Sequence, residues 1–290
     1  MLARFGIGLV SGATLLVGAL LGALLLFGLE RVFVQPHWSK REVPCLELDG
    51  AQGPRFRPNC TGMMATPEAE VVLKTNELGL RDKPNHAILE NPLRILVIGD
   101  GDVEGWWAEK EKSIPALLGS RIPDAYFINA GLREAGPLRQ SERLPALIQA
   151  YRPQGILWFV GERARLEDRA ACSAKRTCAL CQGFQEVASL VAKEKIPLLG
   201  FFRLGAGEET IMACLITAKL DFRIDTAFRD LPAAEKQRFL WENDDHLNPD
   251  AYVREVDLAT DHVQYWLASL KSKTPHPSQE RGHAKPKNEN

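Results

Sequence analysis

Short apolar runs alternate with longer amphipathic segments from about residue 68 to residue 271 of the 290-residue chain. The runs are typical of buried strands, and the longer segments carry apolar residues at helical spacing. The expected strands are residues 94–98, 126–129, 156–160, 198–202 and 222–224, and the expected helices are residues 113–121, 138–150, 182–195 and 256–270. Because this alternation is typical of a parallel sheet covered on both faces, we expect an α/β three-layer sandwich with a mostly parallel sheet of about five strands.

Residues 5–29 form a segment of 25 residues without a charge, rich in Leu, Ala, Gly and Val. A helix needs about 20 apolar residues to cross a hydrocarbon core of ~30 Å, so this segment is long enough to span a membrane. A cleaved signal peptide is the alternative, but its apolar core is typically about 7 to 15 residues long. We therefore expect residues 1–34 to form a membrane anchor, with one transmembrane helix that contacts the lipid through residues 5–29.

Composition predicts the other boundaries. Residues 35–67 contain several prolines and no sustained period, which indicates a linker or a small lobe. Residues 68–271 form the main domain. Residues 272–290 are polar and almost free of apolar side chains, so they cannot bury enough apolar surface to fold and are expected to be disordered.

Charge and cysteine content narrow the function classes. The formal net charge of -1 at pH 7 gives no indication of a nucleic-acid surface. The six cysteines favour disulfides in an oxidising compartment, and one between Cys45 and Cys60 would tie a loop rich in Pro and Gly. A single Cys-x-x-Cys pair is weak evidence for zinc, so no metal and no cofactor are expected. The alternative is a zinc site formed by the other cysteines, which are Cys172, Cys178, Cys181 and Cys214.

The first expected strand ends at Gly99-Asp100-Gly101, where the chain turns toward a helix. This turn resembles the first signature block of the SGNH/GDSL hydrolases, in which a strand is followed by Gly-Asp-Ser. The resemblance implies that Gly101 holds the position of the nucleophile, and glycine has no side chain to attack a carbonyl carbon. Asp100 is expected to brace the turn by accepting backbone N–H bonds. Asp102 is a poor substitute nucleophile, because its side chain would point in another direction.

Two further segments resemble the family in the expected order. Residues 76–82, Asn-Glu-Leu-Gly-Leu-Arg-Asp, look like the Asn-x-x-Gly-x-Arg-Asp lead-in of membrane-associated and extracytoplasmic members. Asn129-Ala130-Gly131, followed by Gly136, resembles the second block, which implies that the backbone N–H of Gly136 is an oxyanion donor. The alternative is that either glycine only allows a turn with positive φ.

The third block departs from the family pattern, and the fourth keeps it. In the third block the family has Gly-x-Asn-Asp, whose Asn donates to the oxyanion, and the nearest position here is Glu162. An ionised carboxylate donates no hydrogen bond and would repel a developing oxyanion. In the fourth block, Asp244-Asp245-His246 resembles the Asp-x-His segment, which implies that His246 is the general base and that Asp244 orients its ring. A different spacing gives the orienting role to Asn243.

These resemblances imply a hydrolase scaffold without its nucleophile. We expect an SGNH-like protein that has lost hydrolase activity and binds an acylated glycan or lipid, or assists envelope modification. Trp106 and Trp107 could line a sugar-binding cleft, although tryptophans at such positions more often pack against neighbouring loops. One alternative is an active esterase or O-acyltransferase on cell-envelope carbohydrate, with Ser113 and Ser141 as the nearest serines. Another is a tethered structural scaffold.

The expected location is the inner (cytoplasmic) membrane, with one span and an extracytoplasmic domain. Arg31, Lys40 and Arg41 follow the apolar segment, whereas only Arg4 precedes it, so the positive-inside rule does not favour an outside domain. The cysteines and the family resemblance favour the opposite orientation. We adopt the extracytoplasmic orientation as the hypothesis.

Overall fold

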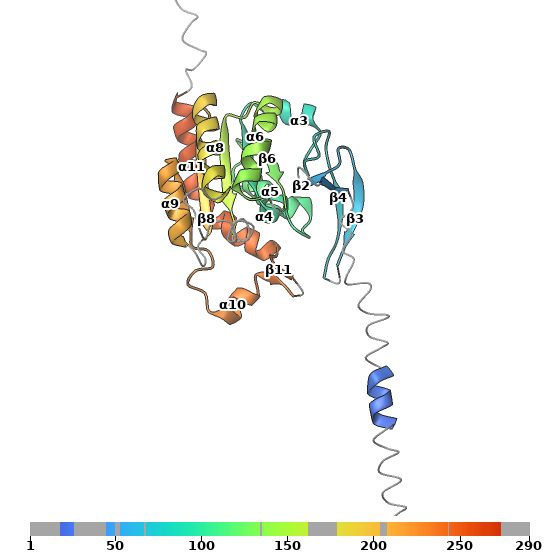
Figure 1. Ribbon diagram of the computed structural model, residues 1–290. Helices are drawn as coiled ribbons and strands as arrows, with labels where there is room; N and C mark the ends of the chain where they lie inside the picture. The colour runs from blue at the N-terminus through green and yellow to red at the C-terminus, as the bar shows by residue number, and fades with distance from the viewer. Residues whose placement is uncertain are drawn as a thin grey trace, which may run out of the picture.

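The computed structural model describes residues 18–25, 45–49, 53–66, 68–133, 135–161, 179–203, 208–242 and 244–273. Its centre is a five-stranded sheet in the order β6-β5-β7-β8-β9. Every neighbouring pair of strands in this sheet is parallel, which confirms the expected α/β fold (Figure 1). The strands are β5 (Arg94–Gly99), β6 (Tyr126–Gly131), β7 (Gly155–Val160), β8 (Leu198–Arg203) and β9 (Phe222–Asp225).

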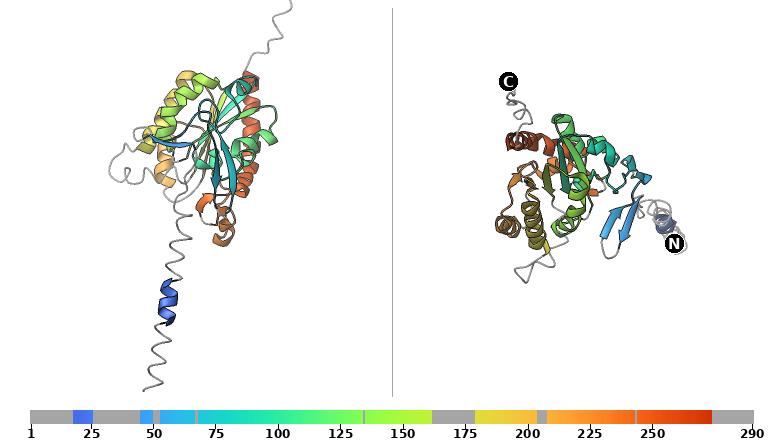
Figure 2. Two further views of the ribbon diagram at one scale, coloured as in Figure 1. Left: turned by 90° about the vertical axis from the view of Figure 1, so that its right-hand side faces the viewer. Right: turned by 90° about the horizontal axis from the view of Figure 1, so that it is seen from above.

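Helices cover both faces of the sheet, as the three views together show (Figures 1 and 2). Of the longer helices that cover the sheet in the described part of the chain, two pack on one face and three on the other. The first two are α5 (Ile114–Arg121) and α11 (Pro249–Lys273), and the other three are α6 (Pro137–Tyr151), α8 (Ala179–Glu194) and α9 (Glu208–Ala218).

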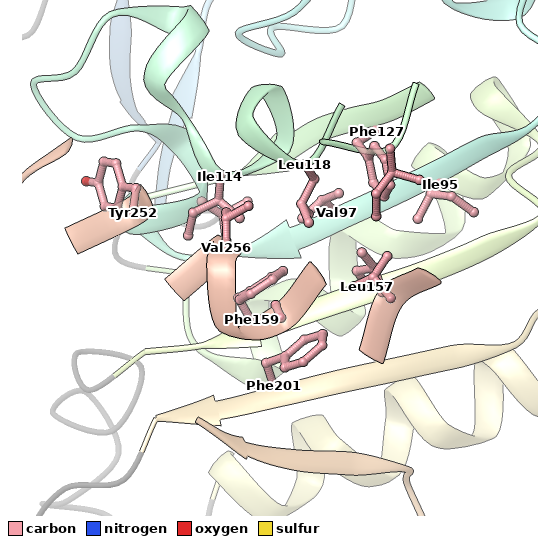
Figure 3. Close-up of a cluster of buried hydrophobic side chains, with 14 of the residues drawn as sticks. Ile95, Val97, Ile114, Leu118, Phe127, Leu157, Phe159, Phe201, Tyr252 and Val256 are labelled. Carbon is pink, nitrogen blue, oxygen red and sulfur yellow. The ribbon is translucent and has the colours of Figure 1, made fainter. Parts of the chain in front are cut away.

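The alternation of side chains along each strand supplies both cores. On β5, Ile95 and Val97 join the cluster under α5 and α11, which Figure 3 shows. Leu96 and Ile98 point to the opposite face and join the cluster under α6, α8 and α9. A strand that is apolar at consecutive positions therefore indicates burial on both faces, as the sequence pattern predicts.

The strand order reverses between β5 and β7, because β6 pairs with one edge of β5 and β7 with the other. In open parallel sheets, ligands usually bind beyond the carboxyl ends of the strands at such a switch point. β5 ends at Gly99 and β7 at Val160. The residues that follow these two strands therefore meet at this point.

Two antiparallel hairpins precede the sheet. The pairs are β1 (Leu46–Asp49) with β2 (Gly53–Phe56), and β3 (Thr61–Ala65) with β4 (Glu70–Lys74). The sequence pattern predicts none of these four strands, because each is only four or five residues long. The β3–β4 hairpin crosses residue 67, the expected end of the linker or small lobe. Phe56, Met64 and Leu73 of these strands form a third core cluster with Trp107 and Leu132.

Other elements differ from the expectation at their ends. α11 begins at Pro249, earlier than expected, because the side-chain oxygen of Asn248 accepts hydrogen bonds from the backbone N–H groups of Asp250 (3.1 Å) and Ala251 (3.2 Å). α9 is not predicted by the sequence pattern, because its apolar residues are consecutive and not spaced for one helix face. The remaining short elements are α3 (Asn85–Leu89), α4 (Gly101–Glu104), η2 (Lys110–Lys112), α10 (Ala233–Gln237), β10 (Leu240–Trp241) and β11 (Asp244–Leu247).

The chain ends are described only in part. Residues 18–25 are helical, and their four leucines are exposed, with Leu20 66% accessible. Within the ranges that the structure describes, no helix is both long and apolar enough to cross a membrane. The rest of the apolar segment 5–29 lies outside the described residues, as do residues 274–290 of the expected tail. α11 continues to Lys273, just beyond the expected end of the main domain.

All four cysteines in the described part of the chain form disulfides. Cys45 bonds to Cys60, and Cys181 bonds to Cys214. The second bond removes two of the four ligands of the alternative zinc site, so that alternative is wrong. Cys172 and Cys178 lie outside the described residues. Among the residues that are described, no group of three or more His, Cys, Asp or Glu side chains could hold a metal ion.

Candidate functional site

The turn after β5 is built by the carboxylate of Asp100. Asp100 is the N-cap of α4, and its Oδ1 accepts a hydrogen bond from the backbone N–H of Asp102 at 3.1 Å. This confirms the expected bracing role. The carboxylate also packs against Gly161 after β7, where a Cβ atom would lie only 2.5 Å from Oδ2 of Asp100. The ends of β5 and β7 therefore meet at the switch point.

Gly101 is the first residue of α4, and little space is open beside it. A Cβ atom at this position would lie 3.1 Å from Cε3 of Trp106 and 3.6 Å from Cβ of Arg133. Trp106 directly follows Gly105, the C-cap of α4, whose φ of 89° is in the left-handed region that favours glycine. A side chain at position 101 would therefore have to share its space with Trp106.

Trp106 lies in a stack of four side chains. The imidazole of His246 is stacked on the indole, with ring centroids 3.8 Å apart and an interplanar angle of 16°. Cζ of Arg133 lies 4.3 Å from the centroid of the same indole. Two groups this close cannot share one face of a ring, so His246 and Arg133 cover opposite faces. On its other side Arg133 lies over Phe56, at 5.1 Å.

This stack covers one face of the imidazole. His246 lies on β11 and is only 8% exposed, although a solvated loop histidine would be open to water. The structure thus brings His246 and position 101 against a common neighbour, Trp106. Trp107 is buried in the third core cluster, as the packing interpretation predicts. The sequence contains no signal that would place Arg133 and His246 on opposite sides of Trp106.

Arg133 is fixed by a buried ion pair with Glu104. Its Nε and its backbone N–H donate to Oε2 of Glu104 at 3.0 and 3.1 Å, and its Nη2 contacts Oε1. Arg133 is 2% exposed and Glu104 is fully buried. Such a bidentate pair is directional as well as strong. It holds the guanidinium in place against the indole.

Asp102 is also held by an arginine. Nη1 of Arg203, at the end of β8, lies 2.9 Å from Oδ2 of Asp102, and Nε of Arg203 donates to Oε1 of Glu255 at 2.6 Å. Burial acts to lower the pKa of Arg203, but the carboxylates of Glu255 and Asp102 outweigh it and raise that pKa well above its usual value. A carboxylate that is paired in this way is not available as a nucleophile.

The lead-in segment supports the turns around the site. Nη1 of Arg81 donates to the carbonyl oxygen of Gly105 at 2.6 Å, and its Nη2 donates to that of Ala108. The side-chain oxygen of Asn76 accepts hydrogen bonds from the backbone N–H groups of Leu78 and Leu80, each at 3.0 Å. The arginine therefore fixes the loop that carries Trp106.

Asp82 connects the same segment to β6. Its Oδ2 accepts a hydrogen bond from the backbone N–H of Asn129 at 2.7 Å, and its Oδ1 accepts one from the hydroxyl of Tyr126. Burial raises the pKa of Asp82 above its usual value, and the hydrogen bonds from Tyr126 and Asn129 oppose that shift. The lead-in is thus a support for the site and contributes no group to the stack.

The glycines of the second block serve close packing. Neither Gly131 nor Gly136 has a positive φ, so the alternative explanation by turn geometry is wrong for both. A Cβ atom on Gly131 would lie 2.2 Å from the backbone nitrogen of Glu104, so only glycine lets α4 approach β6 this closely. Gly136 is the N-cap of α6. Its role as an oxyanion donor stays a prediction.

Three predicted site residues are outside the described residues or are described only in part. Glu162 lies outside the described residues, and so does Asn243. The backbone of Asp244 begins β11 and pairs with Trp241 of β10, but its side chain also lies outside the described part. The orienting role of Asp244 therefore stays a prediction.

The two nearest serines are occupied by other contacts. The hydroxyl of Ser113 donates to the carbonyl oxygen of Lys110 at 2.7 Å, so Ser113 is the N-cap residue of α5 without a capping hydrogen bond from its side chain. The hydroxyl of Ser141 lies 2.6 Å from the carbonyl oxygen of Leu138 and 2.6 Å from a carboxylate oxygen of Glu186. Neither hydroxyl is hydrogen-bonded to the imidazole of a described histidine, as a nucleophilic serine would be.

Comparison with solved structures relates this fold to esterases. The psychrotrophic esterase EstA from Pseudoalteromonas sp., in a structure inhibited by monoethylphosphonate, has a TM-score of 0.50 and 16% identity, over 60% of this chain and 98% of that one. A putative lipolytic protein of the G-D-S-L family from Desulfitobacterium hafniense has a TM-score of 0.44 and 19% identity, over 58% and 98%. A GDSL-like lipase from Bacteroides thetaiotaomicron has a TM-score of 0.46 and 14% identity, over 63% and 94%.

These likenesses concern the fold alone. No family model matches the sequence, and no curated protein matches it significantly. The chain therefore has an SGNH/GDSL hydrolase-like fold, which agrees with the order of the signature segments.

Proposed function

We propose that this protein is a membrane-anchored SGNH-like protein that does not hydrolyse esters, and that its extracytoplasmic domain binds an acylated glycan or lipid of the cell envelope. The observation that carries the proposal is the contact of Trp106 with both position 101 and His246. Gly101 supplies no nucleophile, and the indole stacks on the group that would serve as its base.

The magnitude of the expected loss supports this proposal. In a Ser-His-Asp enzyme, removal of the serine alone lowers turnover by on the order of 10⁶, nearly as much as removal of the whole triad. The neighbouring groups that could substitute are engaged elsewhere, because Asp102 is paired with Arg203 and Ser113 donates to a backbone carbonyl. A rate near that of the uncatalysed reaction is the expected consequence.

Two successive substitutions test the site: the first adds a serine hydroxyl at position 101, and the second removes the indole of Trp106. The full chain carrying Gly101→Ser should hydrolyse an acetyl ester little faster than the parent, because the new Cβ atom meets Trp106 at 3.1 Å. Adding Trp106→Ala should expose the imidazole and produce turnover that His246→Ala removes. Thermal unfolding checks that each variant is folded, and Trp106→Leu replaces Trp106→Ala if the smaller side chain does not fold.

The outcomes separate the two parts of the argument. High turnover from Gly101→Ser alone would contradict the obstruction by Trp106. It would still support the claim that the parent lacks activity because position 101 has no nucleophile. Turnover by the parent protein that depends on His246 would contradict both. Absence of turnover in the double variant would show that the site lacks more than a serine hydroxyl. It would also argue against simple obstruction by Trp106.

The anchor and the ligand need separate tests. The exposed leucines of residues 18–25 and the apolar segment around them support a membrane location. Full-length protein should stay in the membrane fraction after a carbonate wash, and protease added to spheroplasts should digest the domain.

For the ligand, an O-acetylated oligosaccharide should raise the Tm, and its deacetylated counterpart should not. Equal shifts from both sugars would argue against recognition of the acyl group.

A further inference from the structure

A cavity of about 780 Å³ lies beside the stack but does not include Gly101, Trp106 or His246. It is bounded by the β1–β2 hairpin, the lead-in segment, the end of β6 and one face of α6. Phe56, Leu132 and Leu147 supply apolar walls. A cavity of this size, with apolar walls and a few polar groups, is typical of a site for a small molecule.

Four of the six charged residues that line the cavity form two ion pairs. Arg55 lies 3.3 Å from Glu47, and Arg139 lies 2.9 Å from Glu142. These two pairs neutralise four of the charged residues that line the cavity.

Glu77 and Arg143 are the other two charged residues in the lining. Glu77 accepts a hydrogen bond from the backbone N–H of Asn85 at 2.8 Å. The guanidinium of Arg143 makes one long hydrogen bond, 3.4 Å, to the carbonyl oxygen of Ala130. Within the described ranges, no carboxylate lies within salt-bridge distance of Arg143. Arg143 is therefore the one lining charge there with neither an ion pair nor a close hydrogen bond.

A second arginine, Arg139, lies beside Arg143 and is ion-paired with Glu142. Arg139 lies one helical turn before Arg143 on α6, so the two side chains line the same side of the cavity. Burial lowers the pKa of Arg143 to about 10. The positive charge of Arg139 also lowers this pKa, and the carboxylate of Glu104 acts to raise it. An anion between the two guanidinium groups would relieve this repulsion.

We propose that this cavity binds a small ligand through a carboxylate or phosphate group held by Arg143, with Arg139 as a second contact. The planar guanidinium matches both kinds of group, because it can donate two parallel hydrogen bonds. The apolar walls would contact the rest of the ligand. The proposal does not depend on the loss of ester hydrolysis, because Gly101, Trp106 and His246 do not line the cavity. Of the stack, only Phe56 at its end forms a wall of the cavity.

The test is calorimetric titration of the full-length protein in detergent with three probes, inorganic phosphate, glucuronate and octanoate. At least one should bind. Arg143→Gln should weaken that binding at least tenfold, and Arg143→Lys should weaken it less. The matched control is Arg121→Gln, which removes a surface arginine paired with Asp257 on another part of the molecule and should leave the affinity unchanged. The preferred probe distinguishes a phosphate, a polar acid and an apolar acid as the ligand.

A measurement without ligand separates binding from a structural role. Because Arg143 is a partly buried cation without a counter-ion, Arg143→Gln should leave the Tm of the free protein unchanged or raise it. A fall in Tm with unchanged probe affinity would overturn the proposal, as would failure of all three probes to bind. Equal affinity in the parent and in Arg143→Gln would also overturn it, because binding would then occur elsewhere.

Discussion

Replacing Arg133 with methionine should make the protein much easier to unfold, because it leaves the carboxylate of Glu104 buried without a cation. Both side chains are almost completely inaccessible, and two side-chain nitrogens of Arg133 contact that carboxylate. The backbone N–H of Arg133 would still donate to Glu104, at 3.1 Å, so the carboxylate would keep one donor. Methionine keeps an unbranched apolar chain against Trp106, so the change removes charge more than volume.

The expected magnitude follows from the burial. Removing one partner of a buried ion pair typically lowers the free energy of unfolding by about 3–5 kcal/mol. For a domain of about 200 residues, each kcal/mol corresponds to about 2–4 °C, so the Tm should fall by about 6–20 °C. Replacing both partners should cost less, because no charge then stays buried alone. In the described part of the chain, Nη1 of Arg133 is buried without a hydrogen-bond partner, which costs free energy. Arg133→Met and the double variant both remove this cost.

Thermal unfolding followed by circular dichroism gives the measurement for the parent, Arg133→Met, Glu104→Gln and the double variant. The double variant should recover a large part of the loss seen in Arg133→Met, which makes the two changes non-additive. A loss below about 1 kcal/mol, or additive losses, would refute a tightly coupled buried pair.

The remaining predictions concern packing and pH. Gly131→Ala should lower the free energy of unfolding by at least about 2–3 kcal/mol, because the new Cβ atom would lie 2.2 Å from a backbone nitrogen. Gly119→Ala, on a helix where the nearest atom is 4.0 Å away, should instead raise it by about 0.5–1 kcal/mol, and chemical denaturation measures both. Because burial raises the pKa of Asp82 in the folded state, the stabilisation by its bound proton should be complete below pH ~4 and lost as the pH rises through the folded-state value. The stability of the parent relative to Asp82→Asn should therefore be greater at pH 5 than at pH 7, and a constant difference in denaturation midpoints would contradict the shift.

The main sheet could be predicted from the sequence because burial on both faces leaves a local signature. The apolar run that begins at Ile95 shows this, since consecutive apolar residues feed two cores. The N-terminal hairpins leave little signature, because on β3 and β4 only Met64, Val71 and Leu73 are buried. The sequence also gives no direct sign of α9, whose apolar residues do not select one face.

The candidate site was predictable where it depends on local turns. Gly101 and the bracing by Asp100 follow from a short segment and from its resemblance to a known family. The stack was not predictable, because it joins Phe56, Trp106, Arg133 and His246, which are far apart in the sequence. The close packing that requires glycine at position 131 was not predictable either, because the atom that excludes a Cβ there belongs to α4, a separate element.

The loss of hydrolase activity is tested most directly by comparing the full-length parent protein with His246→Ala in the hydrolysis of an acetyl ester. Both proteins should hydrolyse the ester at the same rate, close to that of buffer alone, because the imidazole has no hydroxyl to activate. A parent rate clearly above buffer that falls in His246→Ala would contradict the central claim.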